Sequence, residues 1–193
     1  MGEFLCSFNE GSKNMRSLLG GKGANLSEMT GMGLPVPFGF VLNTKACARF
    51  FENGGALDSA ILEEIKTKIG EIEEVTGKEL GGGENPLLVS VRISNVVKMP
   101  TMTGTVFNLG LNDKTVQGLA RLGDMEFALD CYTRFLRTYG FLVRRIPQHH
   151  FITAYEDIKK KAVAEYGDGY SEEAVLFDAA ERYQACLLYT SPS

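Results

Sequence analysis

Residues 113–185 carry an almost unbroken helical pattern of apolar residues, whereas glycine-rich turns divide the preceding part of the chain into short segments. Two of those segments, Phe40–Leu42 and Leu87–Val91, are short, apolar and rich in residues that favour strands. The pattern changes near Gly110–Asp113. It predicts an α/β (α+β) chain with a mixed region over residues 1–112 and a helical subdomain over 113–185. Residues 186–193 depart from the helical pattern, and we expect them to be a non-native tail.

Local signals predict where the helices begin. A glycine turn precedes a helical segment over Lys22–Met29, and Thr44 is a candidate N-cap for a helix that ends at Asn53. After Asp58, isoleucines recur at helical spacing with charged residues between them, which is typical of an amphipathic helix. Further helix starts are expected at Asp113, Asp124 and Ser171. Arg92 is expected directly after a buried strand.

Composition excludes several classes of protein. The chain has 193 residues, of which 44% are hydrophobic and 23% charged, so it can form a core. Its net charge of −4 and the absence of a basic block argue against a nucleic acid partner. No apolar run approaches the roughly 20 residues of a membrane span. Four scattered cysteines and the lack of a signal sequence predict a reduced, cytoplasmic protein with no membrane partner.

The segment Leu18–Leu26 combines three glycines with Lys22 at the start of a predicted helix. Glycines let backbone amides approach an anion, the helix N-terminus carries partial positive charge, and the lysine adds a full charge. These features indicate a phosphate site, although the spacing is not that of a P-loop. The alternative from composition alone is a glycine-rich turn with a solvated lysine.

Two further positions could contribute to such a site. Arg92 follows a predicted strand, and its planar guanidinium suits phosphate oxygens, while a surface ion pair is the alternative. The polar loop Lys98–Thr105 carries hydroxyls that could close over a nucleotide.

The remaining candidates favour ordinary surface roles. His149 and His150 have no nucleophile or glycine-rich context, which argues against a phosphohistidine or general base there. Four arginines on or beside one predicted helix could form a small basic face, but the acidic chain around them favours ordinary surface ion pairs. They are Arg134, Arg137, Arg144 and Arg145.

Several motifs occur in an order and spacing that resemble the N-terminus of the pyruvate phosphate dikinase family. They are FNEG at 8–11, MRSLLGGKGANLSEM at 15–29, GLPVP at 33–37, PLLVSVR at 86–92 and NLGLND at 108–113. The resemblance covers about residues 4–180. Related dikinases such as phosphoenolpyruvate synthase share the glycine core, and the alternative within enzymes is a phosphoenolpyruvate synthase-like or glucan-dikinase-like relative.

The resemblance implies the first part of an ATP-grasp nucleotide-binding domain with a mostly helical insertion. It also implies a dikinase reaction in the complete enzyme, in which ATP, phosphate and pyruvate yield AMP, pyrophosphate and phosphoenolpyruvate through a phosphohistidine, with Mg²⁺. By position, Lys22 and Arg92 match residues that contact the ATP phosphates, and Thr101 and Met102 lie in the loop that covers them. The complete enzyme is expected to form a homodimer.

The chain departs from the family in the loop after Arg92, where Thr101 stands in place of a glycine and Gly104 in place of an acid. A side chain at position 101 hinders close approach of the backbone to phosphate, so weaker ATP binding is expected. The magnesium ligands, the phosphohistidine and the pyruvate site are expected outside these 193 residues. Catalysis by this chain alone is therefore not expected, and a non-catalytic remnant is the alternative outside enzymes.

Overall fold

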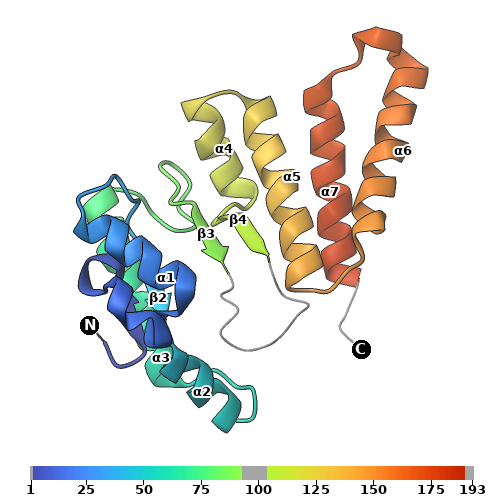
Figure 1. Ribbon diagram of the computed structural model, residues 1–193. Coiled ribbons are helices and arrows are strands. Elements are labelled where there is room, and N and C mark those ends of the chain that lie inside the picture. The colour runs from blue at the N-terminus through green and yellow to red at the C-terminus, as the bar shows by residue number, and fades with distance from the viewer. Residues whose placement is uncertain (1, 93–103, 190–193) are drawn as a thin grey trace. The chain divides into compact units, whose positions relative to one another are not determined.

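A computed structural model describes residues 2–92 and 104–189, which form two compact units (Figure 1). Among the described residues, the first unit contains 2–77 and the second contains 78–92 and 104–189. The chain thus divides at Gly77, whereas the sequence pattern placed the change near residue 112. The difference arises because the strands of the second unit share a core with its helices. The protein is mostly helical, with two small antiparallel sheets, and is an α+β structure.

The first unit surrounds a two-stranded sheet. Strand β1 (Leu5–Ser7) pairs antiparallel with β2 (Phe40–Leu42), and Cys6 lies opposite Val41. Its helices are η1 (Phe8–Glu10), η2 (Lys13–Met15), α1 (Arg16–Gly31), α2 (Thr44–Glu52) and α3 (Ser59–Thr76). The predicted strand at 40–42 and the helix after Asp58 are confirmed.

One predicted helix start is confirmed and one differs. A helical run follows the break at Gly20, as the glycine turn before Lys22 predicted, although one further helical turn, from Arg16, precedes the break within α1. Asn43 caps α2 in place of Thr44, since its side-chain oxygen accepts hydrogen bonds from the amides of Lys45 and Ala46. Thr44 is instead the first helical residue.

Glu64 on α3 holds the N-terminal strand. Its carboxylate accepts hydrogen bonds from the backbone amides of Glu3 at 3.1 Å, Phe4 at 3.2 Å and Leu5 at 3.0 Å. Hydrogen bonds to an ionised acceptor are stronger than bonds between neutral groups. One side chain therefore ties residues 3–5 to α3, beside a small core that contains Leu5 and Ile61.

We expect Glu64→Gln to lower the free energy of unfolding by about 2 kcal/mol, because the amide keeps one acceptor oxygen but loses the charge that three amides share. Urea denaturation followed by circular dichroism measures the change. The control is Glu63→Gln, which removes only an exposed ion pair to Lys66 and should change the free energy by less than about 0.5 kcal/mol. Equal shifts for the two variants would contradict the role of Glu64.

The second unit packs four helices beside a hairpin. Strand β3 (Val89–Arg92) pairs antiparallel with β4 (Thr105–Leu109), and Arg92 lies opposite Thr105. The helices are α4 (Asp113–Leu122), α5 (Met125–Leu142), α6 (Gln148–Tyr166) and α7 (Glu172–Tyr189), with the short η3 (Gly167–Gly169) before α7. Helix α7 lies between α5 and α6 (Figure 1).

The caps of these helices bear out part of the sequence prediction. Asp124 caps α5 and accepts a hydrogen bond from the amide of Phe127 at 2.7 Å. The hydroxyl of Ser171 accepts from the amide of Ala174 at the start of α7. Asn112, not Asp113, caps α4. Helix α7 continues through Cys186–Tyr189, part of the segment expected to be a tail.

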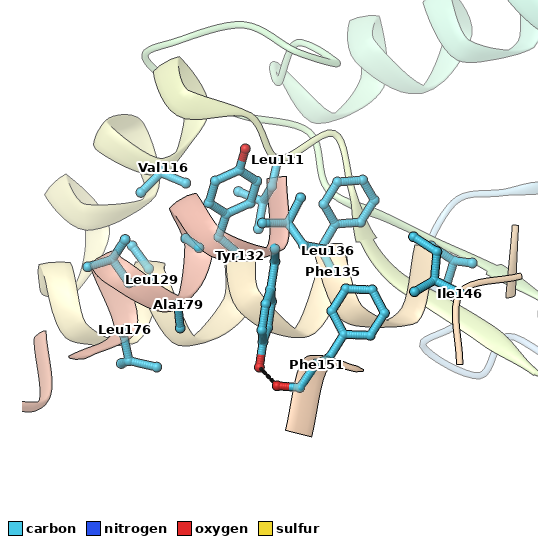
Figure 2. Close-up of a cluster of buried hydrophobic side chains, with 14 residues drawn as sticks. Leu111, Val116, Leu129, Tyr132, Phe135, Leu136, Ile146, Phe151, Leu176 and Ala179 are labelled. Atoms are coloured by element: carbon cyan, nitrogen blue, oxygen red, sulfur yellow. Dashed lines mark hydrogen bonds between the residues drawn. The ribbon is translucent and has the colours of Figure 1, made fainter. Parts of the chain in front are cut away.

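The core of the second unit is centred on Phe151, which is fully buried on α6 (Figure 2). Its ring meets the Tyr183 ring of α7 edge to face, with the centroids 5.0 Å apart. The Tyr183 hydroxyl donates a hydrogen bond to the Phe151 carbonyl at 2.9 Å. On α5, a Cβ at Gly140 would overlap the Phe151 ring. Phe151 therefore joins three helices at one point.

The β3 segment is less buried than the sequence predicted. Leu87 is buried and Leu88 partly buried, but Val91 is 45% exposed and Arg92 is exposed. A sheet of only two strands cannot cover both faces of its strands, which explains the difference. The prediction that Arg92 ends a strand is confirmed.

The NLGLND motif builds the turn from β4 into α4. Asn108 adopts a positive φ of 57° and donates a hydrogen bond from its side chain to the Cys131 carbonyl at 3.3 Å. Gly110 has a φ of 117° and lies against the carbonyl oxygen of Leu87. The Asn112 side chain accepts from the amides of Lys114 and Thr115, as an N-cap does. The polar and glycine residues of the motif thus have structural roles in this turn and at the start of α4.

Tyr132 sits in a polar network that ties α4, α5 and α7 together. Its hydroxyl donates to the Asp113 carboxylate at 3.0 Å, and the Gln184 amide donates to both groups at 2.7 Å. Burial, followed by the Asp113 charge and hydrogen bond, raises the pKa of Tyr132 from 10.0 to about 12.

The second unit should therefore lose stability at alkaline pH. The folded state favours neutral Tyr132, so its contribution is fully present below pH 10 and lost as the pH rises to about 12. Urea denaturation at neutral pH and across this range should show a falling free energy of unfolding. Tyr132→Phe should flatten the fall, leaving a smaller one from Tyr155, whose pKa is also raised to about 12, and from Tyr183, whose pKa burial raises. An unchanged slope in Tyr132→Phe would contradict the assignment.

Across the described residues, no helix is both long enough and apolar enough to span a membrane. No disulfide bond joins the four cysteines, all of which lie within the described ranges.

Candidate functional site

A break in helix α1 lies at the glycine segment that the sequence singled out. Gly20 has φ 69° and ψ 170°, which no helical residue adopts and which glycine tolerates best. A new helical run starts after it. The first amides of such a run have no carbonyl one turn behind them, so they can donate to an external acceptor. Lys22 lies exposed in this first turn.

The neighbouring glycines have different roles. A Cβ at Gly23 would lie 2.8 Å from Cγ2 of Val41 on β2, so this glycine lets α1 pack closely on the sheet. Gly21 instead faces a cation, because its Cβ position lies 3.2 Å from Nη2 of Arg16. The arrangement after the break therefore combines the first amides of a helical run, Lys22 and a second positive side chain. Such a cluster suits an anion with several oxygens.

The sequence pattern alone does not point to Arg16. It precedes Lys22 by six positions, a spacing that would place the two side chains on different faces of a regular helix. Only the break at Gly20 brings Arg16 beside the start of the following run. The signal in the sequence that could have indicated Arg16 is a positively charged residue shortly before a glycine pair.

Arg92 is the last residue of β3 and is exposed. Its backbone is fixed by pairing with Thr105 on β4. Arg92 is thus the last described residue of β3, directly before residues 93–103 in the sequence. Thr101 and Met102, the other predicted contacts, lie outside the described residues. Lys22 belongs to the first unit and Arg92 to the second.

The other described sequence candidates lie in the second unit. His149 and His150 are exposed in the first turn of α6, with ring centroids 4.2 Å apart. Arg134 pairs with Asp130 at 2.8 Å, as expected of a surface ion pair. Within 2–92 and 104–189, no cluster of three His, Cys, Asp or Glu residues could hold a metal ion.

Two cavities have linings that include none of the residues of the glycine break. A cavity of about 190 Å³ in the first unit has a mostly apolar lining that includes Leu42, Phe50 and Ile61. A wider groove of about 760 Å³ in the second unit is lined by residues of α5, α6 and α7. Its rim holds Glu172, whose carboxylate accepts a hydrogen bond from Tyr155 at 2.6 Å. Neither cavity is lined by Lys22 or Arg92.

Comparison with known proteins supports the resemblance drawn from the motifs. Residues 16–81 match the family model for the pyruvate phosphate dikinase AMP/ATP-binding domain. The chain is 39% identical over 186 residues to a pyruvate, phosphate dikinase of Clostridium symbiosum, covering 96% of this chain and 21% of that protein. It is 44% identical over 154 residues to the pyruvate, phosphate dikinase of Entamoeba histolytica, covering 79% of this chain and 17% of that protein.

A third relative is pyruvate, phosphate dikinase 2 of Zea mays, which is 46% identical over 152 residues, with 79% of this chain and 17% of that protein covered. The chain thus spans about a fifth of the length of these relatives. The predicted resemblance to the pyruvate phosphate dikinases is confirmed, and the matched domain includes the whole glycine segment.

Proposed function

We propose that this chain, similar to pyruvate phosphate dikinases over 96% of its length, binds the phosphates of ATP or AMP at the break in α1. The observation that carries the proposal is the match of residues 16–81 to an AMP/ATP-binding domain, because this range contains Gly20–Gly23. Lys22 supplies a mobile full charge to a phosphate, and the amides after Gly20 supply hydrogen bonds.

Arg92 is proposed as a second contact to the transferring phosphates. Its guanidinium can bind two phosphate oxygens at once, and its fixed place at the end of β3 supports that role. Thr101 and Met102 are proposed as weaker contacts of the same nucleotide. Phosphoryl transfer depends mainly on such positioning and on neutralising charge.

In the complete enzyme, the chain is proposed to form the first part of an ATP-grasp domain of a phosphotransferase. That enzyme would convert ATP, phosphate and pyruvate to AMP, pyrophosphate and phosphoenolpyruvate through a phosphohistidine. The names of the relatives support this reading. A cytoplasmic location and a homodimer of the complete enzyme belong to the same proposal. This chain alone is not proposed to catalyse the reaction.

Magnesium is proposed as the ion that accompanies ATP. The described residues do not fit a magnesium site of their own, since they contain no suitable group of three acidic, histidine or cysteine ligands. No step is therefore assigned to Mg²⁺ held by this chain. The ion would neutralise phosphate charge while bound to the nucleotide, and Lys22 would add to that effect.

The alternatives are less well supported. A phosphoenolpyruvate synthase-like fragment would share the glycine segment, but the similar proteins named above are all pyruvate, phosphate dikinases. A non-catalytic remnant would keep the fold and lose nucleotide binding. Titration separates that possibility from the proposed function.

We expect calorimetric titration of the full chain with Mg-ATP to show saturable binding that Lys22→Ala weakens about tenfold or more, because a charge-assisted contact is lost. Lys66→Ala is the control, since it also removes one lysine charge but lies on α3 in an ion pair with Glu63. Arg92→Ala, measured in parallel, should also weaken binding. Absence of binding by the unmodified chain, or equal losses in Lys22→Ala and Lys66→Ala, would contradict the proposal.

A further inference from the structure

We infer that Arg16 is a second phosphate-contacting cation at the break in α1, and that it favours a nucleoside triphosphate over a monophosphate. The inference rests on the proposed nucleotide binding and adds a residue and a preference to it. The observation behind it is the position of the Arg16 guanidinium beside Gly21.

The geometry at Gly21 is specific. A Cβ built there would lie 3.2 Å from Nη2 of Arg16 and 3.6 Å from its Cζ and Nε. The whole guanidinium therefore lies along the missing side chain of Gly21. In a regular helix, side chains lean toward the N-terminus, so Arg16 would point away from a residue five positions later. Because of the break at Gly20, the Arg16 guanidinium instead lies beside Gly21.

The surroundings leave the Arg16 guanidinium available for an anion. Arg16 and Lys22 are both exposed. In the part of the chain that the structure describes, no carboxylate forms an ion pair with Arg16. Gly21 has no side chain, so the guanidinium lies close to the backbone where the new helical run begins. A planar guanidinium and the first amides of that run can thus bind oxygens of the same anion.

Two cations around one turn suit a chain of phosphates. In the sequence, Arg16 precedes the break at Gly20 and Lys22 follows it, so one cation comes from each side of the break. A triphosphate offers oxygens on successive phosphates to both cations, whereas AMP offers one phosphate. Loss of Arg16 should therefore weaken the binding of ATP more than that of AMP.

The test is calorimetric titration of the full chain with Mg-ATP and with AMP. Arg16→Ala should bind ATP roughly tenfold more weakly and AMP less than about threefold more weakly, because it removes a charged hydrogen-bonding partner. Arg16→Lys should recover part of the loss, since it keeps the charge but not the planar pair of donors. Lys66→Ala again controls for the removal of one positive charge.

Gly21→Ala tests position without changing charge. The Cβ of the new alanine would crowd the Arg16 guanidinium, so ATP binding should weaken. Stability should be kept, because alanine favours a helix more than glycine does. If Lys22→Ala weakens ATP binding and Arg16→Ala does not, or if Arg16→Ala weakens ATP and AMP equally, the inference is overturned and the proposed function stands. If the unmodified chain binds neither nucleotide, both are overturned.

Discussion

Phe151→Ala should lower the free energy of unfolding by about 4 kcal/mol, because it removes a fully buried aromatic side chain and leaves a cavity. Phe151 is the point at which α6 meets both α5 and α7. Gly140 on α5 cannot fill the space, since it has no side chain. The Tyr183 ring would lose its edge-to-face partner as well. Urea denaturation, followed by the tyrosine signal, measures the loss.

The neighbouring Ile152→Ala is the matched control for this prediction. Ile152 lies on the same turn of α6 but is 47% exposed, so its truncation should change the free energy by less than about 1 kcal/mol. Hydrogen exchange adds a second measurement, in which Phe151→Ala should speed exchange across α5, α6 and α7 together. Comparable losses in the two variants would show that Phe151 is not the centre of this core.

Gly110→Ala is expected to destabilise the chain by about 4 kcal/mol, because two separate costs combine at this position. A φ of 117° is strained for any residue with a Cβ. The added carbon would also overlap the backbone carbonyl of Leu87, which cannot rotate away as a side chain could. The turn that carries the Asn112 cap would have to shift, and the start of α4 with it.

Gly83→Ala is the control for Gly110→Ala within the same unit. Gly83 is exposed, and a Cβ there meets no atom within 4 Å. Its φ is not in the left-handed region, so alanine should be neutral or slightly stabilising. Thermal unfolding of both variants would separate the effects. A melting temperature for Gly110→Ala equal to that of the unmodified chain would show that the turn tolerates a side chain.

Local signals in the sequence predicted most of the described α-helices, but not α6 or the strands β1 and β4. The isoleucine spacing after Asp58 and the caps at Asp124 and Ser171 depend on contacts within one turn, so the sequence alone predicted them. The choice of Asn43 over Thr44 depended on which of two adjacent polar residues faced the helix. That choice follows from the bond between the Asn43 side chain and the Glu3 carbonyl 40 residues away, which no local pattern shows.

The sequence pattern points to only one of the two cations at the break in α1. It indicates Lys22, because glycines and a lysine at a helix start are typical of a phosphate site. Arg16 was missed because its nearness to Gly21 depends on the φ of Gly20, a property that the pattern of side chains does not give. The NLGLND motif supported the family resemblance, yet its polar groups are used in a turn and a helix cap. A shared motif can therefore mark a common fold without marking a site.

Gly77 has a practical consequence for dividing this chain. It ends α3 in the left-handed conformation, with its amide bonded to the Glu73 carbonyl, and it is the last residue of the first unit. The family match runs four residues further, to position 81, and so enters the segment that pairs Glu79 with Leu87 in the second unit. Expression limits chosen from the sequence match would cut into the second unit. Limits placed after Gly77 would leave the described residues of each unit whole.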